Sequence, residues 1–181
     1  SDDVARVDLL TRRVLDSAVS SDYARREERL SDKVNIVRLD CGEEGYITKE
    51  QLWDSLDTFA DNALSYIRER QLTPDIIHSH YADAGYVGVR LSSLLGIPLV
   101  HTGHSLGRVK RQRLLASGLK RDEIERQYNI SRRIEVEEDV LGAAELVITS
   151  TRQEIEEQYG LYNHYQPEQM KVVPPGTELD P

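Results

Sequence analysis

A pair of histidines and a cluster of cations follow an apolar stretch near the middle of the chain. The segment HTGHSLGRVKRQR runs from His101 to Arg113 and places His104 and Ser105 between two glycines, ahead of four Lys or Arg residues. Glycine allows a ligand to approach the backbone closely, and N–H groups with nearby cations favour a phosphate. The segment therefore predicts a loop that binds a phosphorylated ligand, with His104 at its lip and Lys110 one turn into a helix.

Charge is distributed unevenly along the 181 residues, whose net charge is -9. Residues 108–133 hold nine Lys or Arg and three Asp or Glu, whereas residues 134–160 hold eight acids and one Arg. A basic island in an acidic protein favours one defined anionic ligand and argues against non-specific nucleic-acid binding. The alternative is a solvated helical face, and it is the interpretation preferred here for Arg108, Arg111 and Arg113.

Two other chemistries use the same residues and are weaker hypotheses. His78, His80, His101 and His104 are possible ligands of a zinc-type metal in a hydrolase, but no carboxylate or thiolate lies at ligand spacing. His78 and His101 stand in apolar runs, so both are predicted to be buried and hydrogen-bonded. Covalent catalysis by Ser105 beside His104 is disfavoured, because adjacent residues rarely pair as nucleophile and base and no G-x-S-x-G motif occurs. A non-enzymatic alternative is a sugar-phosphate-binding or regulatory module.

The elements that position these residues alternate between strand and helix. Short apolar runs predict strands at residues 7–11, 34–39, 75–79, 98–102, 145–150 and 171–176. Helical spacing predicts helices from about 49 or 50 to 71, then 82–95, 108–117, 121–141 with a break near 129–131, and 152–160. The polar segment 12–33 is predicted to be a long surface loop that is in part helical. This order predicts an α/β fold with a Rossmann-like parallel sheet and helices on both faces, with ligands outside the carboxyl ends of its strands.

The ends of the sequence suggest an internal piece of a larger protein. No G-x-G turn accompanies the first predicted strand, so a Rossmann-like domain over residues 1–176 is expected to lack its first strand and glycine-rich loop. Residues 177–181 are expected to begin a linker to a second domain. The sequence shows no apolar run of membrane-spanning length, no signal peptide, and one cysteine, Cys41, which is typical of a cytoplasmic protein.

Several of these segments together resemble one enzyme family. HSHYADAGYVGVRLSSLLGIPLVHTGHSLGRVKRQRLL, YNISRRIEVEEDVL, VITSTRQEIEEQYGLY and VVPPG are similar to the acceptor-side domain of sucrose-phosphate synthases, over residues 7–176. These are retaining glycosyltransferases of the two-Rossmann-domain (GT-B) type. The resemblance implies transfer of glucose from UDP-glucose to fructose 6-phosphate, without a tightly bound metal or cofactor. It further implies that a second, nucleotide-sugar-binding domain is needed and that this segment alone is inactive.

The resemblance also implies roles for individual residues. His104 in TGHSLG matches the family's histidine beside the transferred glucose. Six further positions match its fructose 6-phosphate contacts: Lys49, Tyr81, Ser105, Lys110, Arg132 and Arg133. The two adjacent arginines lie about 100° apart on a helix, so they need not both face the ligand.

Overall fold

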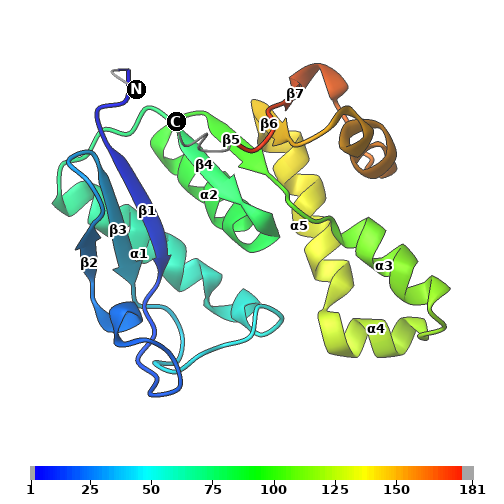
Figure 1. Ribbon diagram of the computed structural model, residues 1–181, viewed down its shortest axis with the longest axis horizontal. Helices are drawn as coiled ribbons and strands as arrows, with labels where there is room; N and C mark the ends of the chain where they lie inside the picture. The colour runs from blue at the N-terminus through cyan, green and yellow to red at the C-terminus, as the bar shows by residue number, and fades with distance from the viewer. Residues whose placement is uncertain (1–2, 177–181) are drawn as a thin grey trace, which may run out of the picture. The chain divides into compact units, whose positions relative to one another are not determined.

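The computed structural model describes residues 3–176 and divides the chain into two compact units, Ser1–Thr73 and Pro74–Pro181. Each unit has its own hydrogen-bonded sheet with helices beside it (Figure 1). The single domain over residues 1–176 stays a prediction, and the linker predicted at residues 177–181 lies outside the described part of the chain.

The first unit is built on a three-stranded sheet in the order β1-β3-β2. Strand β1 (Val7–Arg12) pairs in parallel with β3 (Val34–Leu39), and β2 (Glu27–Arg29) pairs antiparallel with β3. A 3-10 turn (Ser21–Ala24) lies within the segment predicted to be a partly helical loop, whereas β2 in the same segment was not predicted. The β2 sequence Glu-Glu-Arg carries no apolar signal, and the strand forms because β3 offers its free backbone edge.

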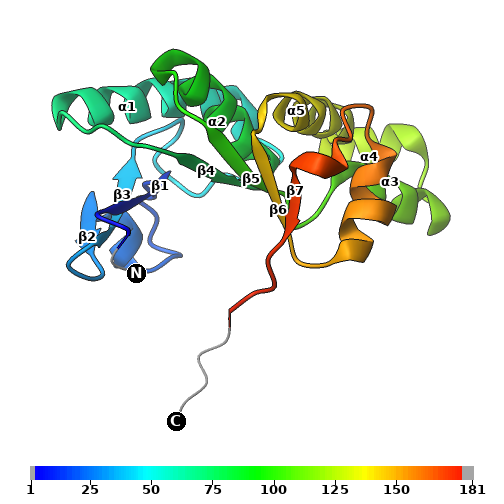
Figure 2. The ribbon, with the colours of Figure 1, turned by 90° about the horizontal axis from the view of Figure 1, so that it is seen from above.

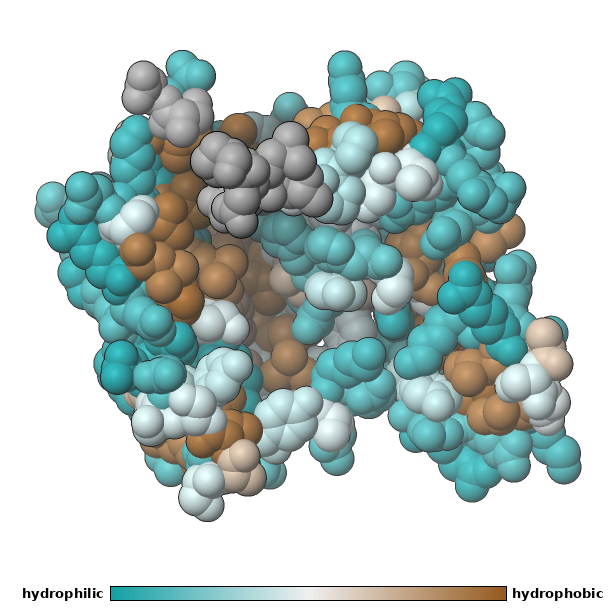
Figure 3. Space-filling model, viewed as in Figure 1, coloured by the Kyte–Doolittle hydropathy of each residue, from teal (hydrophilic) through white to brown (hydrophobic). Residues whose placement is uncertain are grey.

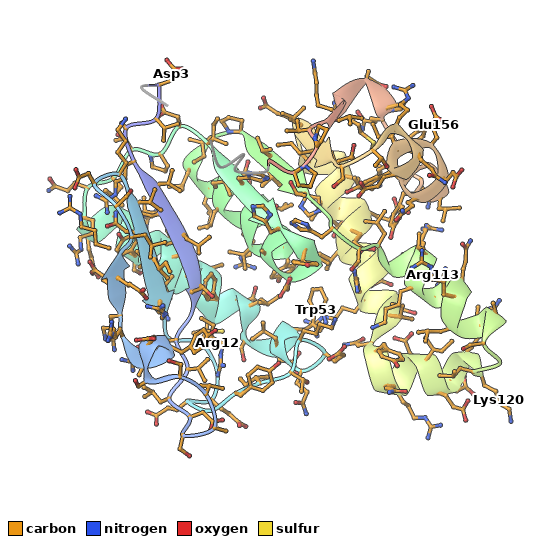
Figure 4. The ribbon with its side chains drawn as sticks, viewed as in Figure 1. Asp3, Arg12, Trp53, Arg113, Lys120 and Glu156 are labelled. Carbon is orange, nitrogen blue, oxygen red and sulfur yellow. The ribbon has the colours of Figure 1, made fainter. Side chains whose placement is uncertain are left out.

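Helix α1 (Leu56–Glu69) supplies the helical part of this unit's core. The residues at helical spacing are buried and lie on one face, namely Leu56, Ala60, Ala63 and Ile67. A 3-10 turn (Leu52–Ser55) precedes α1 and buries Trp53, so the α-helix begins later than the predicted start near residue 49. The Arg12 guanidinium donates to the carbonyls of Cys41 (2.9 Å) and Gly45 (2.7 Å) and so holds the loop after β3 (Figure 4).

The second unit is a four-stranded parallel sheet in the order β4-β5-β6-β7. Its strands are β4 (Ile77–His80), β5 (Leu99–Thr102), β6 (Leu146–Thr149) and β7 (Met170–Val172). Figure 2 shows α2 (Tyr81–Leu95) and α5 (Ile130–Ala143) along one face of this sheet. The prediction of an α/β fold with a parallel sheet is confirmed.

Local signals set the ends of the helices in this unit. α2 ends at Gly96, whose φ of 68° and N–H bond to the Ser92 carbonyl (2.8 Å) form the predicted C-cap. α3 (Gly107–Ala116) and α4 (Arg121–Tyr128) follow, and the predicted break before α5 lies at Asn129, with φ 45°. Among residues 3–176, no helix combines the length and apolar character needed to cross a membrane.

The helix predicted over residues 152–160 is irregular. A five-residue π-helical turn (Glu154–Gln158) leads into a 3-10 turn (Tyr159–Leu161), and a further 3-10 turn (Pro167–Gln169) precedes β7. Tyr159 is fully buried and its hydroxyl accepts from the Gly103 N–H at 3.2 Å. This tertiary contact accompanies the irregular helix, and π-helical turns are frequent at functional sites.

Candidate functional site

The carboxyl ends of β4 and β5 bring three ring side chains together. In the parallel register His80 stands beside Thr102, so the residues that follow each strand meet at one edge of the sheet. His80 Nδ1 lies 2.8 Å from His104 Nε2, a hydrogen bond in which one nitrogen donates and the other accepts. The Tyr81 and His104 rings have centroids 4.7 Å apart. These side chains are exposed, so a ligand at this edge can reach them.

Both ring residues that begin the connections at this edge have unusual backbone conformations. Tyr81 has φ 67° and His104 has φ 57°, in the left-handed region that favours glycine. A non-glycine residue there costs about 1–3 kcal/mol and persists where surrounding contacts hold it. Such strain clusters at ligand-binding sites, so the backbone marks this edge independently of the side chains.

Histidines at this edge stack in a row. The ring centroids of His78 and His80 are 4.3 Å apart, and those of His80 and His104 are 5.1 Å apart. Although both rings are partly exposed, partial loss of water lowers the pKa of His78 and His80 below the ordinary value, and the neighbouring rings lower it further. Among the described residues, no group of three or more His, Cys, Asp or Glu side chains is arranged to hold a metal ion.

The two histidines predicted to be buried differ from each other. His101 is 2% exposed, and its Nδ1 lies 2.9 Å from the Ser79 hydroxyl on the adjacent strand, as predicted. His78 is exposed, so its prediction was wrong, although its Nε2 lies 2.9 Å from the Thr102 hydroxyl. Successive residues of a strand face opposite sides of the sheet, and register rather than apolar neighbours decides which side each ring takes.

The loop between β5 and α3 is anchored at both glycines. A Cβ on Gly103 would lie 2.6 Å from the Tyr159 hydroxyl, so only glycine fits against this buried tyrosine. The Gly107 N–H donates to both carboxylate oxygens of Glu137, at 2.8 and 3.0 Å. Glu137 is 2% exposed and also accepts a short hydrogen bond from the Tyr162 hydroxyl. No local sequence signal marks these anchors, because they lie 30 or more residues from the glycines they hold.

Arg133 joins the loop to helix α5. Its Nε donates to Glu137 at 2.9 Å, and one terminal nitrogen donates to the Ser105 carbonyl (2.5 Å) and hydroxyl (3.0 Å). The structure thus brings Arg133 and Ser105 together. The Lys110 ammonium lies 3.8 Å from the centre of the Tyr128 ring, a cation–π contact between α3 and α4.

Arg108 is not a solvated surface cation, which corrects the interpretation from its sequence. Its guanidinium pairs with Glu138 and lies over the Tyr162 ring, and its side chain is 24% exposed. Burial raises the pKa of Glu138, but bonds from the N–H groups of Asn163 and His164 and from Arg108 outweigh this and hold that pKa below its ordinary value. The basic island is therefore partly neutralised by acids of α5.

Two predicted site residues, Lys49 and Arg132, lie outside the loop between β5 and α3. Lys49 belongs to the first unit, in the turn before Leu52, and its side chain is exposed. Arg132 lies in the first turn of α5 beside Arg133 and is half-buried. Their acceptor roles stay predictions, as do those of the other site residues.

A cleft of about 340 Å³ opens between α3, α4 and α5, away from the strand ends. Its lining includes Arg111, Arg121 and Glu125, and the Glu125 carboxylate accepts from the Ser131 hydroxyl at 2.8 Å. Figure 3 shows hydrophilic residues around a small apolar area over α3 and α4. None of the predicted site residues lines this cleft.

Comparisons with known proteins agree with the fold and with the resemblance seen in the sequence. Residues 2–176 match the family model described as "Glycosyl transferase 4-like domain". The chain is 44% identical to sucrose-phosphate synthase 4 of Arabidopsis thaliana over 90% of its length, and 44% identical to the sucrose-phosphate synthase of Zea mays over 94%. A solved sucrose-phosphate synthase from Thermosynechococcus elongatus superposes with a TM-score of 0.74 and 28% identity over 95% of this chain.

The matched proteins are considerably longer than this chain. It spans 18% of the length of each of these two plant relatives and 38% of the solved bacterial chain. The family match nevertheless extends over nearly all of the 181 residues, including both units and the loop that carries His104. The chain belongs to the glycosyl transferase 4-like domain family.

Proposed function

We propose that this chain forms the acceptor side of a sucrose-phosphate synthase. In the proposed reaction the 2-hydroxyl of fructose 6-phosphate attacks the anomeric carbon of UDP-glucose, the bond to UDP breaks, and sucrose 6-phosphate forms with retention. The support is 44% identity with two plant proteins of that name over at least 90% of the chain. The donor's nucleotide is assigned to another domain, and no tightly bound metal or cofactor takes part.

The observation that carries the proposal is the combination of groups at the loop after β5. Ser105 offers a hydroxyl beside the Arg133 guanidinium at 3.0 Å, and Lys110 stands one turn into α3. A guanidinium beside a hydroxyl favours a phosphate, and the Lys110 ammonium, which lies over the Tyr128 ring, adds a second cation on the adjacent helix. We assign these three residues, with Lys49, Tyr81 and Arg132, to fructose 6-phosphate.

His104 has a separate role in the proposal, as the contact to the transferred glucose. Its ring is exposed at the carboxyl end of β5, and its hydrogen bond to His80 fixes the ring's direction. A side chain held in this way can meet a sugar hydroxyl without reorganising, which is how preorganised donors and acceptors assist transfer.

Replacement of Lys110 by alanine tests whether the site recognises the phosphate. A charge-assisted hydrogen bond contributes about 1.5–3 kcal/mol, and partial exposure of Lys110 screens some of it. In the product of the complete reading frame containing this chain, we expect Lys110→Ala to lower kcat/KM for fructose 6-phosphate roughly 5- to 50-fold. The lower kcat/KM for free fructose, which has no phosphate, should change little.

Arg113→Ala is the matched control, because Arg113 is an exposed cation on the same helix (Figure 4). It changes the net charge equally and should leave the ratio of the two acceptors as in the wild type. Equal losses for phosphorylated and free fructose in Lys110→Ala would contradict the assignment of Lys110. A wild-type protein that uses both acceptors equally well would contradict the proposed function.

A further inference from the structure

A buried carboxylate contacts the end of the loop between β5 and α3 and takes no direct part in the function proposed above. Glu137 on α5 is 2% exposed, and three groups from different segments donate to it. They are the Gly107 N–H, Arg133 Nε at 2.9 Å, and the Tyr162 hydroxyl. A buried charge is strongly unfavourable unless such donors satisfy its oxygens, so this arrangement requires all three segments to be in place.

The chain around Glu137 is adapted to let the carboxylate approach. A Cβ on Gly107 would lie 2.8 Å from Glu137 Oε2 and 2.9 Å from Ile134 Cγ1, so no larger residue fits there without displacement. Burial raises the pKa of Tyr162, and the adjacent Glu137 raises it further, so the phenol keeps its proton and remains a donor. The start of α3 is thereby held against α5 and the segment that contains Tyr162.

Glu137 also controls the other end of the loop through Arg133. The Arg133 side chain is 12% exposed and uses Nε for Glu137 and a terminal nitrogen for the Ser105 carbonyl and hydroxyl. The two attachments are at Ser105 and Gly107. The segment that they hold comes directly after His104, whose φ of 57° requires external support. One carboxylate therefore supports both ends of the segment from Ser105 to Gly107.

We propose that Glu137 is a positioning residue of the acceptor site: it holds Arg133 and residues 105–107 in the arrangement that receives the sugar phosphate. This proposal rests on the function proposed above. A glutamine at this position has the same shape but replaces one oxygen by an NH₂ group. Each oxygen of the carboxylate faces at least one N–H group, of Gly107 or Arg133, and an N–H group cannot accept, so the NH₂ group faces a donor at either position and at least one bond is lost.

The test combines kinetics with a measurement that needs no substrate. In the complete protein we expect Glu137→Gln to raise KM for fructose 6-phosphate roughly 10-fold, the effect of one lost charge-assisted hydrogen bond, with kcat within about 3-fold of wild type. In the 181-residue chain, NMR hydrogen exchange at the Gly107 amide should accelerate roughly 10-fold or more, while the β5 amides keep wild-type rates.

Glu138→Gln is the matched control: it neutralises the neighbouring acid, which binds Arg108 rather than Arg133. It should leave KM for fructose 6-phosphate near the wild-type value. If Glu137→Gln fails to fold, Glu137→Asp keeps the charge but shortens the reach, and a smaller KM increase with faster Gly107 exchange is expected.

Several outcomes would contradict the positioning role of Glu137. Unchanged KM or unchanged Gly107 exchange in a folded Glu137 variant would overturn the proposal, as would an equal KM increase in Glu138→Gln. A fall in kcat with unchanged KM would do the same. If wild type fails to prefer fructose 6-phosphate over fructose, the proposed function fails and this proposal with it, a result visible before any variant is made.

Discussion

One buried residue, His101, links the two strands that carry the candidate site. Its ring is buried beside the Ser79 hydroxyl of β4 and is removed from water. Burial, with smaller contributions from His78, His80 and His104, lowers its pKa from 6.5 to about 3. The ring is therefore neutral at neutral pH in the folded chain, and its protonation opposes folding.

We expect this ring to make the chain acid-sensitive. Between pH 6.5 and about 3 the unfolded state binds the proton and the folded state does not, so stability falls as pH falls. From pH 7 to pH 5 the contribution to the free energy of unfolding is a loss of about 2 kcal/mol. Urea unfolding at both pH values should show this loss in wild type and a smaller one in His101→Asn.

Each protein serves as its own control in that comparison, because the loss is measured between pH 7 and pH 5 within the same protein. Both stabilities of His101→Asn are expected to be lower because a core ring is lost, so only the difference between pH values is diagnostic. An unchanged difference in His101→Asn would show that another group causes the acid sensitivity.

At the scale of elements, α2 lies unusually close to its neighbours because two of its residues are glycines. A Cβ on Gly85 would lie 2.7 Å from Val140 Cγ2 of α5, and a Cβ on Gly88 would lie 2.8 Å from Leu99 Cδ1 of β5. This close packing sets the position of α2, whose first residue is Tyr81, and hence the position of that ring at the site. Glycine thus serves packing here, at the expense of helix propensity.

Two glycine-to-alanine substitutions should have effects of opposite sign. Gly88→Ala improves helix propensity by about 1 kcal/mol but forces the buried Leu99 to move, which costs about 1–3 kcal/mol. We expect a net loss of about 1 kcal/mol by urea unfolding. The Cβ that Gly142→Ala adds to α5 would contact only His164, at 3.6 Å. This substitution should raise the free energy of unfolding by up to about 1 kcal/mol. Stabilisation by both substitutions would show that α2 is loosely packed.

At the scale of the whole molecule, the division into two units has a consequence for unfolding. Each unit has its own sheet and its own buried residues, Val37 and Ala63 in the first and Leu99 and Val147 in the second. A packing defect in one unit acts first on the buried residues of that unit. Trp53, the chain's single tryptophan, is 7% exposed in the first unit and provides a specific probe of it.

We expect the two units to respond separately to core substitutions. Gly88→Ala should lower the urea midpoint for hydrogen exchange of β5 amides and leave the Trp53 fluorescence midpoint unchanged. Ala63→Gly, in the core of the first unit, should do the reverse, because an interior helical glycine costs about 1 kcal/mol. If each substitution shifts both midpoints equally, the chain unfolds as one cooperative unit.

The sequence by itself determined those features that depend on neighbours along the chain. Helix α2 ends where Gly96 caps it, and Asn129 separates α4 from α5, both close to the predicted positions. The apolar strands and the α/β class follow in the same way, because periodicity and caps act within a few residues. The segment containing His104 was identifiable because glycines, histidine and cations occur together in it.

Only the tertiary structure decided which of the charged side chains bind one another. The sequence shows Arg108 and Arg133 only as members of a basic island, whereas the structure pairs them with Glu138 and Glu137 of α5. Glu137 in turn reaches Gly107, a residue 30 positions earlier in the chain. Such contacts depend on how α3 and α5 pack, and β2 depends likewise on pairing with β3. No local pattern encodes them, because the partners become neighbours only when the chain folds.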